Sequence, residues 1–195
     1  MQGTYPLNLD VTSPPTIERW RPLINWILII PHAIWLYLLL IAAEVLAFLG
    51  WFAILFTGQL PESWGDFIMG VLRYQWRVYA WLYGWTTTYP SFSPTGGFVD
   101  PGDYPAIFYC ARPAQRNRLT VAFRLILAIP QLIVIWIVAI PASVVLFLAW
   151  FAVLFTGRWP ESFRSFAVGF FRWYGRLAGY LHLVTDEYPP FSMQP

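Results

Sequence analysis

The chain has 195 residues, of which 58% are hydrophobic and 20% are aromatic, whereas only 11% carry a charge. Soluble domains have about a quarter of charged residues, so this composition argues against an ordinary water-soluble protein. The formal net charge is +2 and the basic residues form no run, so nothing favours nucleic-acid binding. The single cysteine, Cys110, excludes an intrachain disulfide and a cysteine metal cluster.

The sequence is one unit written twice. The segment Trp-Phe-Ala-Ile-Leu-Phe-Thr-Gly at residues 51–58 returns at residues 150–157 with Val in place of Ile. The offset of 99 residues holds without a gap from residues 5–93 to residues 104–192. This pattern predicts a first repeat over residues 1–93, a second over residues 104–195 and a short turn-rich linker, residues 94–103, that keeps the two repeats in contact.

Each repeat opens and closes with a short segment that we expect to be extended. The opening segments, residues 5–11 and 104–110, alternate in polarity and each begin with Tyr-Pro, which favours a strand over a helix. We expect these strands at the membrane surface. The closing segments, residues 86–93 and 185–192, are aromatic and contain Tyr-Pro as well, and we expect each to pair with the opening strand of its own repeat.

A long apolar run follows each opening segment. Residues 22–57 contain one charge, Glu44, and residues 125–156 contain none. Both runs exceed the roughly 20 residues that span a bilayer, and as a single helix each would be about 50 Å long. Proline breaks helices, so Pro31 and Pro130 predict a division into interfacial helices and spanning helices, with Pro141 as a further kink. The predicted interfacial helices are residues 19–30 and 118–129, and the predicted spanning helices are residues 31–56 and 130–155, ending before Gly58 and Gly157.

A second helix in each repeat begins at a Pro-Glu-Ser sequence, at residues 61–63 and 160–162. Its charged and small residues fall on a narrow stripe, and its remaining face is apolar and aromatic. Such a stripe is typical of a helix that spans a membrane inside a bundle, which we favour, or of one that lies flat beneath the headgroups. The expected fold is therefore an all-α integral membrane protein. It is a tandem repeat of a helical hairpin with about four membrane-embedded helices, interfacial helices and short extended Tyr-Pro segments at the surface.

The candidate binding residues are the arginine pairs Arg73/Arg77 and Arg172/Arg176. A spacing of four residues places both guanidinium groups of a pair on one helix face, where an anion between them relieves their repulsion. A lipid phosphate or a carboxylate would serve, so these are predicted lipid-headgroup or ion-pair residues. The competing interpretation is that each arginine extends separately to water.

Glu44 is the only ionisable residue deep in an apolar run, which makes it a functional candidate. Its depth below the hairpin turn matches that of Arg73, so we expect an ion pair with Arg73, Arg77 or Arg172. A protonated glutamate, a proton or ion relay and a contact with a bound partner are the alternatives. Ser143 stands at the matching position of the second repeat, so the fold itself does not need the pair.

No arrangement in the sequence indicates catalysis or a cofactor. His32 and His182 do not match between the repeats, lack metal-ligand neighbours and are expected to hydrogen-bond near helix ends. No glycine-rich phosphate loop, nucleophile elbow or metalloprotease motif occurs, so we expect neither an enzyme nor a metal or cofactor protein. Arginines cluster beside the termini and the linker, which predicts that both termini are cytoplasmic.

The motif at residues 51–58, the Pro-Glu-Ser sequence, the Gly-x-x-Arg-x-x-x-Arg of residues 70–77 and the closing Tyr-Pro-x-Phe-Ser resemble a bacterial membrane domain, the domain of unknown function 4389, here in tandem. The resemblance implies a protein of the bacterial cytoplasmic (inner) membrane and carries no activity. We expect a non-enzymatic accessory or scaffold subunit that binds lipids and packs against a larger membrane protein complex or a further copy of itself. The alternative is a small transporter or lipid-handling protein with a site between the repeats, against which two similarly oriented repeats would argue.

Overall fold

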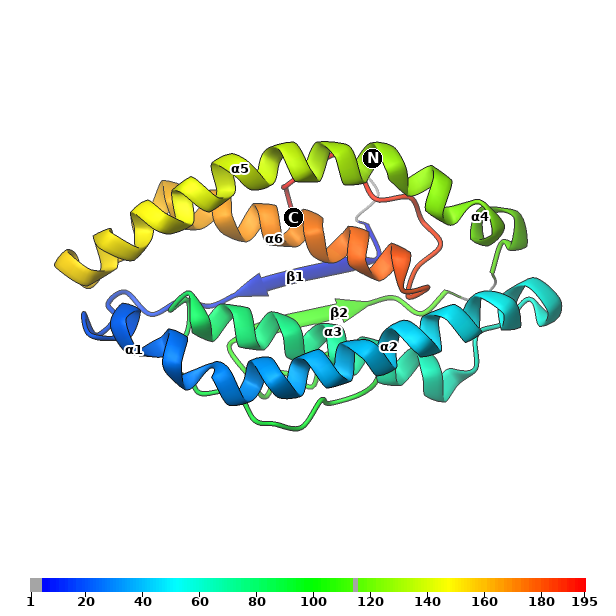
Figure 1. The fold of residues 1–195 in the computed structure, drawn as a ribbon, viewed down its shortest axis with the longest axis horizontal. Helices are drawn as coiled ribbons and strands as arrows, with labels where there is room; N and C mark the ends of the chain where they lie inside the picture. The colour runs from blue at the N-terminus through cyan, green and yellow to red at the C-terminus, as the bar shows by residue number, and fades with distance from the viewer. Residues whose placement is uncertain (1–4, 114–115) are drawn as a thin grey trace.

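The computed structural model describes residues 5–113 and 116–195, and it is mostly helical with two repeated halves (Figure 1). The first half consists of β1 (Leu7–Val11), α1 (Arg21–Leu28), α2 (Ile30–Thr57) and α3 (Glu62–Leu82). The second half consists of β2 (Ala106–Cys110), α4 (Arg118–Ala122), α5 (Arg124–Thr156) and α6 (Glu161–Leu181). Each half thus holds one long apolar helix, α2 or α5.

The glycine stops are where the sequence predicts them. Gly58 follows α2 with a φ of 79°, and Gly157 follows α5 with a φ of 69°. Only glycine adopts this left-handed conformation without strain, and both N–H groups close the last helical turn. Each hairpin therefore turns immediately after Thr-Gly, and the following helix returns along the first.

The break predicted at Pro130 is wrong. In the first half the chain kinks at Ile29, so Pro31 lies in the first turn of α2, where proline needs no hydrogen bond. In the second half the break lies earlier, at Phe123, and α5 continues through both Pro130 and Pro141. The Asn117 side chain accepts hydrogen bonds from two backbone N–H groups of α4, which fixes the start of α4. Both prolines lie inside α5, which is bowed (Figure 1).

The two opening segments are strands, as predicted, but the expected partner and location are wrong. They pair with each other in antiparallel fashion, with Leu9 opposite Phe108. These two residues are equivalent in the repeat, so a pseudo-two-fold axis passes between them. Alternate residues of each strand are buried against the helices, so the strands form part of the core and not a surface element.

The two halves are consequently antiparallel and not similarly oriented. In Figure 1, α2 runs from left to right along the lower edge and α5 runs from right to left along the upper edge. The indole N–H of Trp51 near the end of α2 donates to the Val121 carbonyl oxygen in α4 (2.8 Å). The equivalent Trp150 near the end of α5 donates to the Pro22 carbonyl oxygen in α1 (2.7 Å). The first helix of each half, α1 or α4, therefore lies beside the end of the long helix of the other half.

The core lies between α3 and α6, and most residues of both helices are buried. Strand β2 packs on α3 and β1 packs on α6, so each half covers its inner helix with the strand of the other half. Among the described residues, only α2 and α5 are long and apolar enough to cross a membrane. The expectation of four membrane-embedded helices is therefore not supported, because the charged stripes of α3 and α6 are covered by strands and loops of the chain itself.

Candidate functional site

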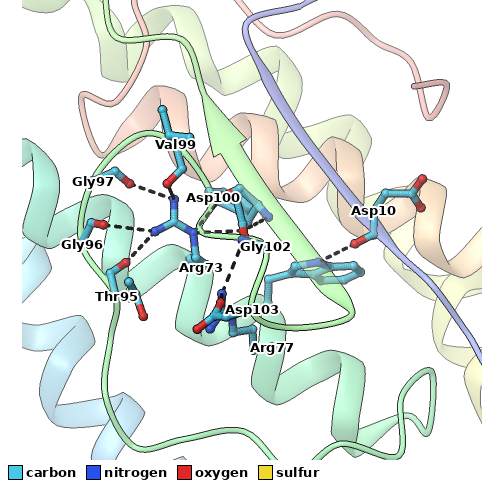
Figure 2. Close-up of polar contacts among 12 residues, drawn as sticks. Asp10, Arg73, Arg77, Thr95, Gly96, Gly97, Val99, Asp100, Gly102 and Asp103 are labelled. Carbon is cyan, nitrogen blue, oxygen red and sulfur yellow. Dashed lines mark hydrogen bonds and ion pairs between the residues drawn. The ribbon is translucent and has the colours of Figure 1, made fainter.

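Arg73 on α3 is the most extensively bonded charged side chain in the first half, and it is 1% exposed. Its Nη2 donates to the carbonyl oxygens of Gly97 (2.8 Å) and Val99 (3.1 Å), and its Nη1 donates to that of Thr95 (2.5 Å). Its Nε lies 3.1 Å from the Asp100 carboxylate. Figure 2 shows the linker curled around the guanidinium group, so Arg73 holds the linker in place.

Arg77, one turn further along α3, continues this site toward the solvent. Its Nη2 lies 2.6 Å from Oδ1 of Asp103 and 3.7 Å from Oδ1 of Asp100, and its guanidinium lies over the Tyr104 ring. The hydrogen bond from Arg77 lowers the pKa of Asp103. The first arginine pair thus has carboxylate partners from the linker. Of the two predicted roles, lipid-headgroup contact or ion pair, these contacts correspond to the ion pair.

The second arginine pair has fewer partners. Arg172 Nε donates to the Leu9 carbonyl oxygen (3.1 Å) and Nη1 to that of Met193 (2.9 Å), while Nη2 lies 3.6 Å from the Asp10 carboxylate. Arg176 makes long bonds, each of 3.4 Å, to the backbone oxygens of Leu7 and Ser192. Both equivalent arginines, Arg73 and Arg172, therefore donate through Nε to the opening strand of the opposite half, at Phe108 and Leu9.

The expected partners of Glu44 are wrong. Glu44 lies on an exposed face of α2 that points toward the second half, whereas Arg73, Arg77 and Arg172 point toward the strands. Its Oε1 lies 3.2 Å from Nε2 of His182, without the geometry of a hydrogen bond. The equivalent Ser143 donates to the carbonyl oxygen of its own helix at Ala139 (2.8 Å). The charge at this position thus belongs to one half only.

His32 and the equivalent Gln131 occupy the same buried position between the helices of each hairpin. The His32 ring contacts the Tyr74 hydroxyl through Nδ1, and Gln131 accepts a hydrogen bond from the Trp173 indole N–H (2.7 Å). The prediction of a hydrogen-bonding role for His32 is confirmed. The second histidine, His182, bonds back to the Ala178 carbonyl oxygen at the end of α6.

Sequence reasoning missed a polar site that differs between the halves. Arg124 is 1% exposed, and its Nη2 donates to the Asp186 carboxylate at 2.6 Å. Asp186 also lies 3.0 Å from Arg116. The equivalent of Arg124 is Asn25, whose side chain donates to the Trp81 carbonyl oxygen at 3.0 Å. The sequence does contain a signal for this site. The neutral residues Asn25 and Thr87 of the first repeat correspond to the oppositely charged residues Arg124 and Asp186 of the second.

Two cavities lie at the contact between the halves, at positions related by the pseudo-two-fold axis. The first, the Asn25 cavity, has a volume of about 390 Å³ and lies between α1 and the end of α5. Its lining is apolar except for Arg21 and Asn25. The second, the Arg124 cavity, has a volume of about 330 Å³ and is lined by Glu44, Arg124 and apolar residues of α2, of the start of α5 and around the end of α6. In the described ranges, no group of three potential metal-binding side chains occurs.

These features define a duplicated, mostly helical protein with two long apolar helices and a core of exchanged strands. The chain belongs to the family described as Domain of unknown function (DUF4389), whose model matches it twice, at residues 19–93 and 118–193. The family assignment from the motifs is therefore confirmed, including the tandem arrangement. No curated protein and no solved structure shows significant similarity to the chain.

Proposed function

We propose that the protein is a membrane-embedded, non-enzymatic accessory subunit whose long helices contact lipid and which packs against a larger membrane protein complex. The observation that carries the proposal is the apolar outer surface of α2 and α5. Only 28% of the most apolar stretch of α2 and 17% of that of α5 are buried within the protein. A core helix of a soluble protein would be covered by its own chain.

The exposed side chains on these helices are large. Among those exposed by 60% or more are Ile34, Tyr37, Phe48, Phe56, Leu125, Trp136, Phe147 and Phe155. Burying a side chain of this size contributes roughly 1.5–3 kcal/mol, and soluble monomers seldom expose apolar patches above a few hundred Å². Acyl chains of a bilayer, or the apolar surface of a partner, would cover both helices at once.

Exposed arginines at both ends of the apolar layer are better placed for lipid phosphate than the two buried pairs. Arg118 lies beside Gly58 at the end of α2, and the equivalent Arg19 lies beside Gly157 at the end of α5. Both arginines are exposed, so their guanidinium groups can reach lipid phosphates. Because arginines flank both ends of the antiparallel halves, the arginine count no longer favours cytoplasmic termini, and we propose the bacterial cytoplasmic membrane without a fixed orientation.

Purification in a mild detergent, followed by identification of the recovered proteins, tests the accessory role. We expect the protein to remain with the membrane after carbonate washing and to elute with one larger membrane complex in fixed proportion. Release by carbonate would contradict membrane embedding. Elution of the protein alone, from membranes of its native host, would contradict the accessory role.

A second candidate function, lipid handling between the repeats, is supported by the two related cavities. The antiparallel halves have the inverted arrangement found in many transporters, so the argument that similarly oriented repeats oppose transport does not apply. In the Asn25 cavity, Oδ1 of Asn25 is buried without a hydrogen-bond partner, and a ligand hydroxyl would satisfy it.

Mass spectrometry of the detergent-purified protein tests this second function. We expect a stoichiometric apolar lipid in the wild type and its loss in Ala149→Trp, which fills the Asn25 cavity. Ala33→Trp, on an exposed face of α2, is the matched control. Equal lipid content in all three proteins would argue against a site in this cavity.

A further inference from the structure

The linker does more than connect the halves, because it pairs with the outer edge of β2. The backbone N–H of Cys110 donates to the Phe98 carbonyl oxygen at 3.1 Å. The N–H of Phe108 donates to the Asp100 carboxylate at 2.7 Å. Together with the bonds from Arg73, these two bonds hold the linker against the edge of β2, and Figure 2 shows the linker loop beside this strand.

The equivalent edge of β1 has no such segment among the residues that the structure describes. Leu9 and Val11 are the counterparts of Phe108 and Cys110. The N–H of Leu9 bonds to the side chain of the preceding Asn8 (2.9 Å), and that of Val11 to the side chain of the preceding Asp10 (2.8 Å). Both are local contacts that a competing strand can replace, so β1 keeps an open edge.

A cleft of about 480 Å³ lies beside this edge. Its polar lining consists of Asp10, Arg164, Ser165, Arg172 and Gln194. The segment that follows the closing Tyr-Pro sequence crosses α3 in the first half and α6 in the second half at an equivalent glycine. A Cβ on Gly70 would lie 3.1 Å from Cα of Gly96, and a Cβ on Gly169 would lie 2.9 Å from Cβ of Met193. Beyond this crossing the linker of the first half encloses Arg73, whereas in the second half the cleft lies beside Arg172.

We propose that the cleft beside Arg172 binds an extended, acidic peptide segment of a partner protein, which adds to the open edge of β1 as the linker adds to β2. A carbonyl oxygen of the segment accepts from the N–H of Val11, and a carboxylate accepts from the N–H of Leu9 and from Arg172. Arg164, which stands where the first half has Gly65 and is ion-paired with Glu161 (2.8 Å), also lines the cleft.

The charge of the cleft favours an acidic segment. Arg172 has three polar partners, of which the Asp10 carboxylate is 62% exposed and 3.6 Å away, whereas Arg73 bonds five backbone oxygens and a carboxylate of the linker and β2. A bound carboxylate gives Arg172 the partner that Asp100 gives Arg73. The inference rests on the proposed accessory role for the existence of a partner, and it names the segment by which that partner is held.

A peptide with the sequence of the linker serves as the probe for binding to the cleft. A labelled peptide with the sequence of residues 94–103, Pro-Thr-Gly-Gly-Phe-Val-Asp-Pro-Gly-Asp, is titrated with the full-length protein in detergent, and its fluorescence anisotropy is recorded. We expect saturable binding with one peptide per protein. Replacing both aspartates of the peptide by asparagine weakens binding by tenfold or more. Absence of saturable binding, or equal binding of the asparagine peptide, would overturn the proposal.

Two variants locate the binding site. Arg172→Gln removes the central charge of the cleft. Ser165→Trp fills the cleft from an exposed position on α6, so we expect it to keep the fold, and gel filtration checks the fold of both variants. Each folded variant is expected to weaken peptide binding at least tenfold, whereas Arg158→Gln, an exposed arginine outside the cleft, leaves it unchanged. Unaltered binding by the folded variants would overturn the assignment of the cleft.

The two sets of experiments also distinguish a failure of the cleft proposal from a failure of the proposed accessory role. Peptide binding without any co-purifying complex supports the cleft and contradicts the accessory role. Recovery of a complex by Ser165→Trp at the wild-type level, with no peptide binding to the wild type, contradicts the cleft and supports the accessory role.

Discussion

Equivalent residues of the two halves have unequal roles, and the arginines show this most directly. Arg73 and Arg172 occupy the same position of the Gly-x-x-Arg-x-x-x-Arg motif, but Arg73 is enclosed by the linker and lies against a carboxylate that is 7% exposed. We expect Arg73→Ala to destabilise the protein by about 3–5 kcal/mol, because it leaves a buried carboxylate and several carbonyl groups without a partner. Arg172→Ala removes two backbone contacts and one distant ion pair, so about 1–3 kcal/mol is expected.

Denaturant titration followed by tryptophan fluorescence checks both substitutions in the same detergent. The ratio between the two losses is the informative quantity, since the two residues match in chemistry and position in the repeat. An equal loss at both positions would show that the linker contributes nothing to the stability of the Arg73 site.

Cys110 gives a chemical test of the buried strand pair. It is 3% exposed on β2, and burial raises the pKa of its thiol to about 12. Only the thiolate reacts with maleimide reagents, so we expect no labelling of the native protein at pH 8 during the time in which the protein denatured in dodecyl sulfate reacts completely. Rapid labelling of the native protein would show that β2 is not packed against α3. Cys110 is the only cysteine, so no other thiol contributes to the signal.

At the scale of single elements, local signals in the sequence predicted local structure and did not predict partners. Thr-Gly stops and Pro-Glu starts act through the backbone within one helical turn, and the structure has them where expected. The pairing of the opening strands depends on how the two halves are arranged relative to each other. The residues next to each strand do not determine that arrangement. The ion pair of Arg73 with Asp100 was missed for the same reason, because the linker was interpreted as a connection and not as a ligand of the helix.

The contact between β1 and α6 depends on small residues of α6. A Cβ on Gly179 would lie 2.3 Å from Cδ1 of Leu7, and one on Gly175 would lie 2.7 Å from Cδ2 of Leu9. We expect Gly179→Ala to destabilise the protein by about 1–3 kcal/mol, because the strand must move away from the helix. Combining it with Leu7→Ala removes the clashing methyl group, so the double variant should lose less stability than the sum of the single variants. Strict additivity in a double-mutant cycle would show that the two residues are not in contact.

At the scale of the whole molecule, the two sequence repeats do not coincide with the two packing units of the structure, because the repeats exchange their strands. The first repeat contributes β1 to the core of the second, and the second contributes β2 to the core of the first. A pseudo-two-fold axis between Leu9 and Phe108 relates the two sets, so the chain is arranged as a symmetric dimer whose subunits are joined by the linker. Neither repeat has a complete core without the other.

Cleavage of the linker tests this dependence. Pro101 and Gly102 are exposed, so a protease recognition sequence inserted after Gly102 keeps Asp100 at Arg73 and is accessible to the enzyme. We expect the two fragments to elute together from a gel-filtration column in mild detergent after complete cleavage, because the strand pair and the packing of each strand on the opposite helix do not need a continuous chain. Dodecyl sulfate should separate them. Separation in mild detergent, with each fragment still folded by circular dichroism, would mean that each repeat completes its own core, and the exchanged strands would then not describe the protein in solution.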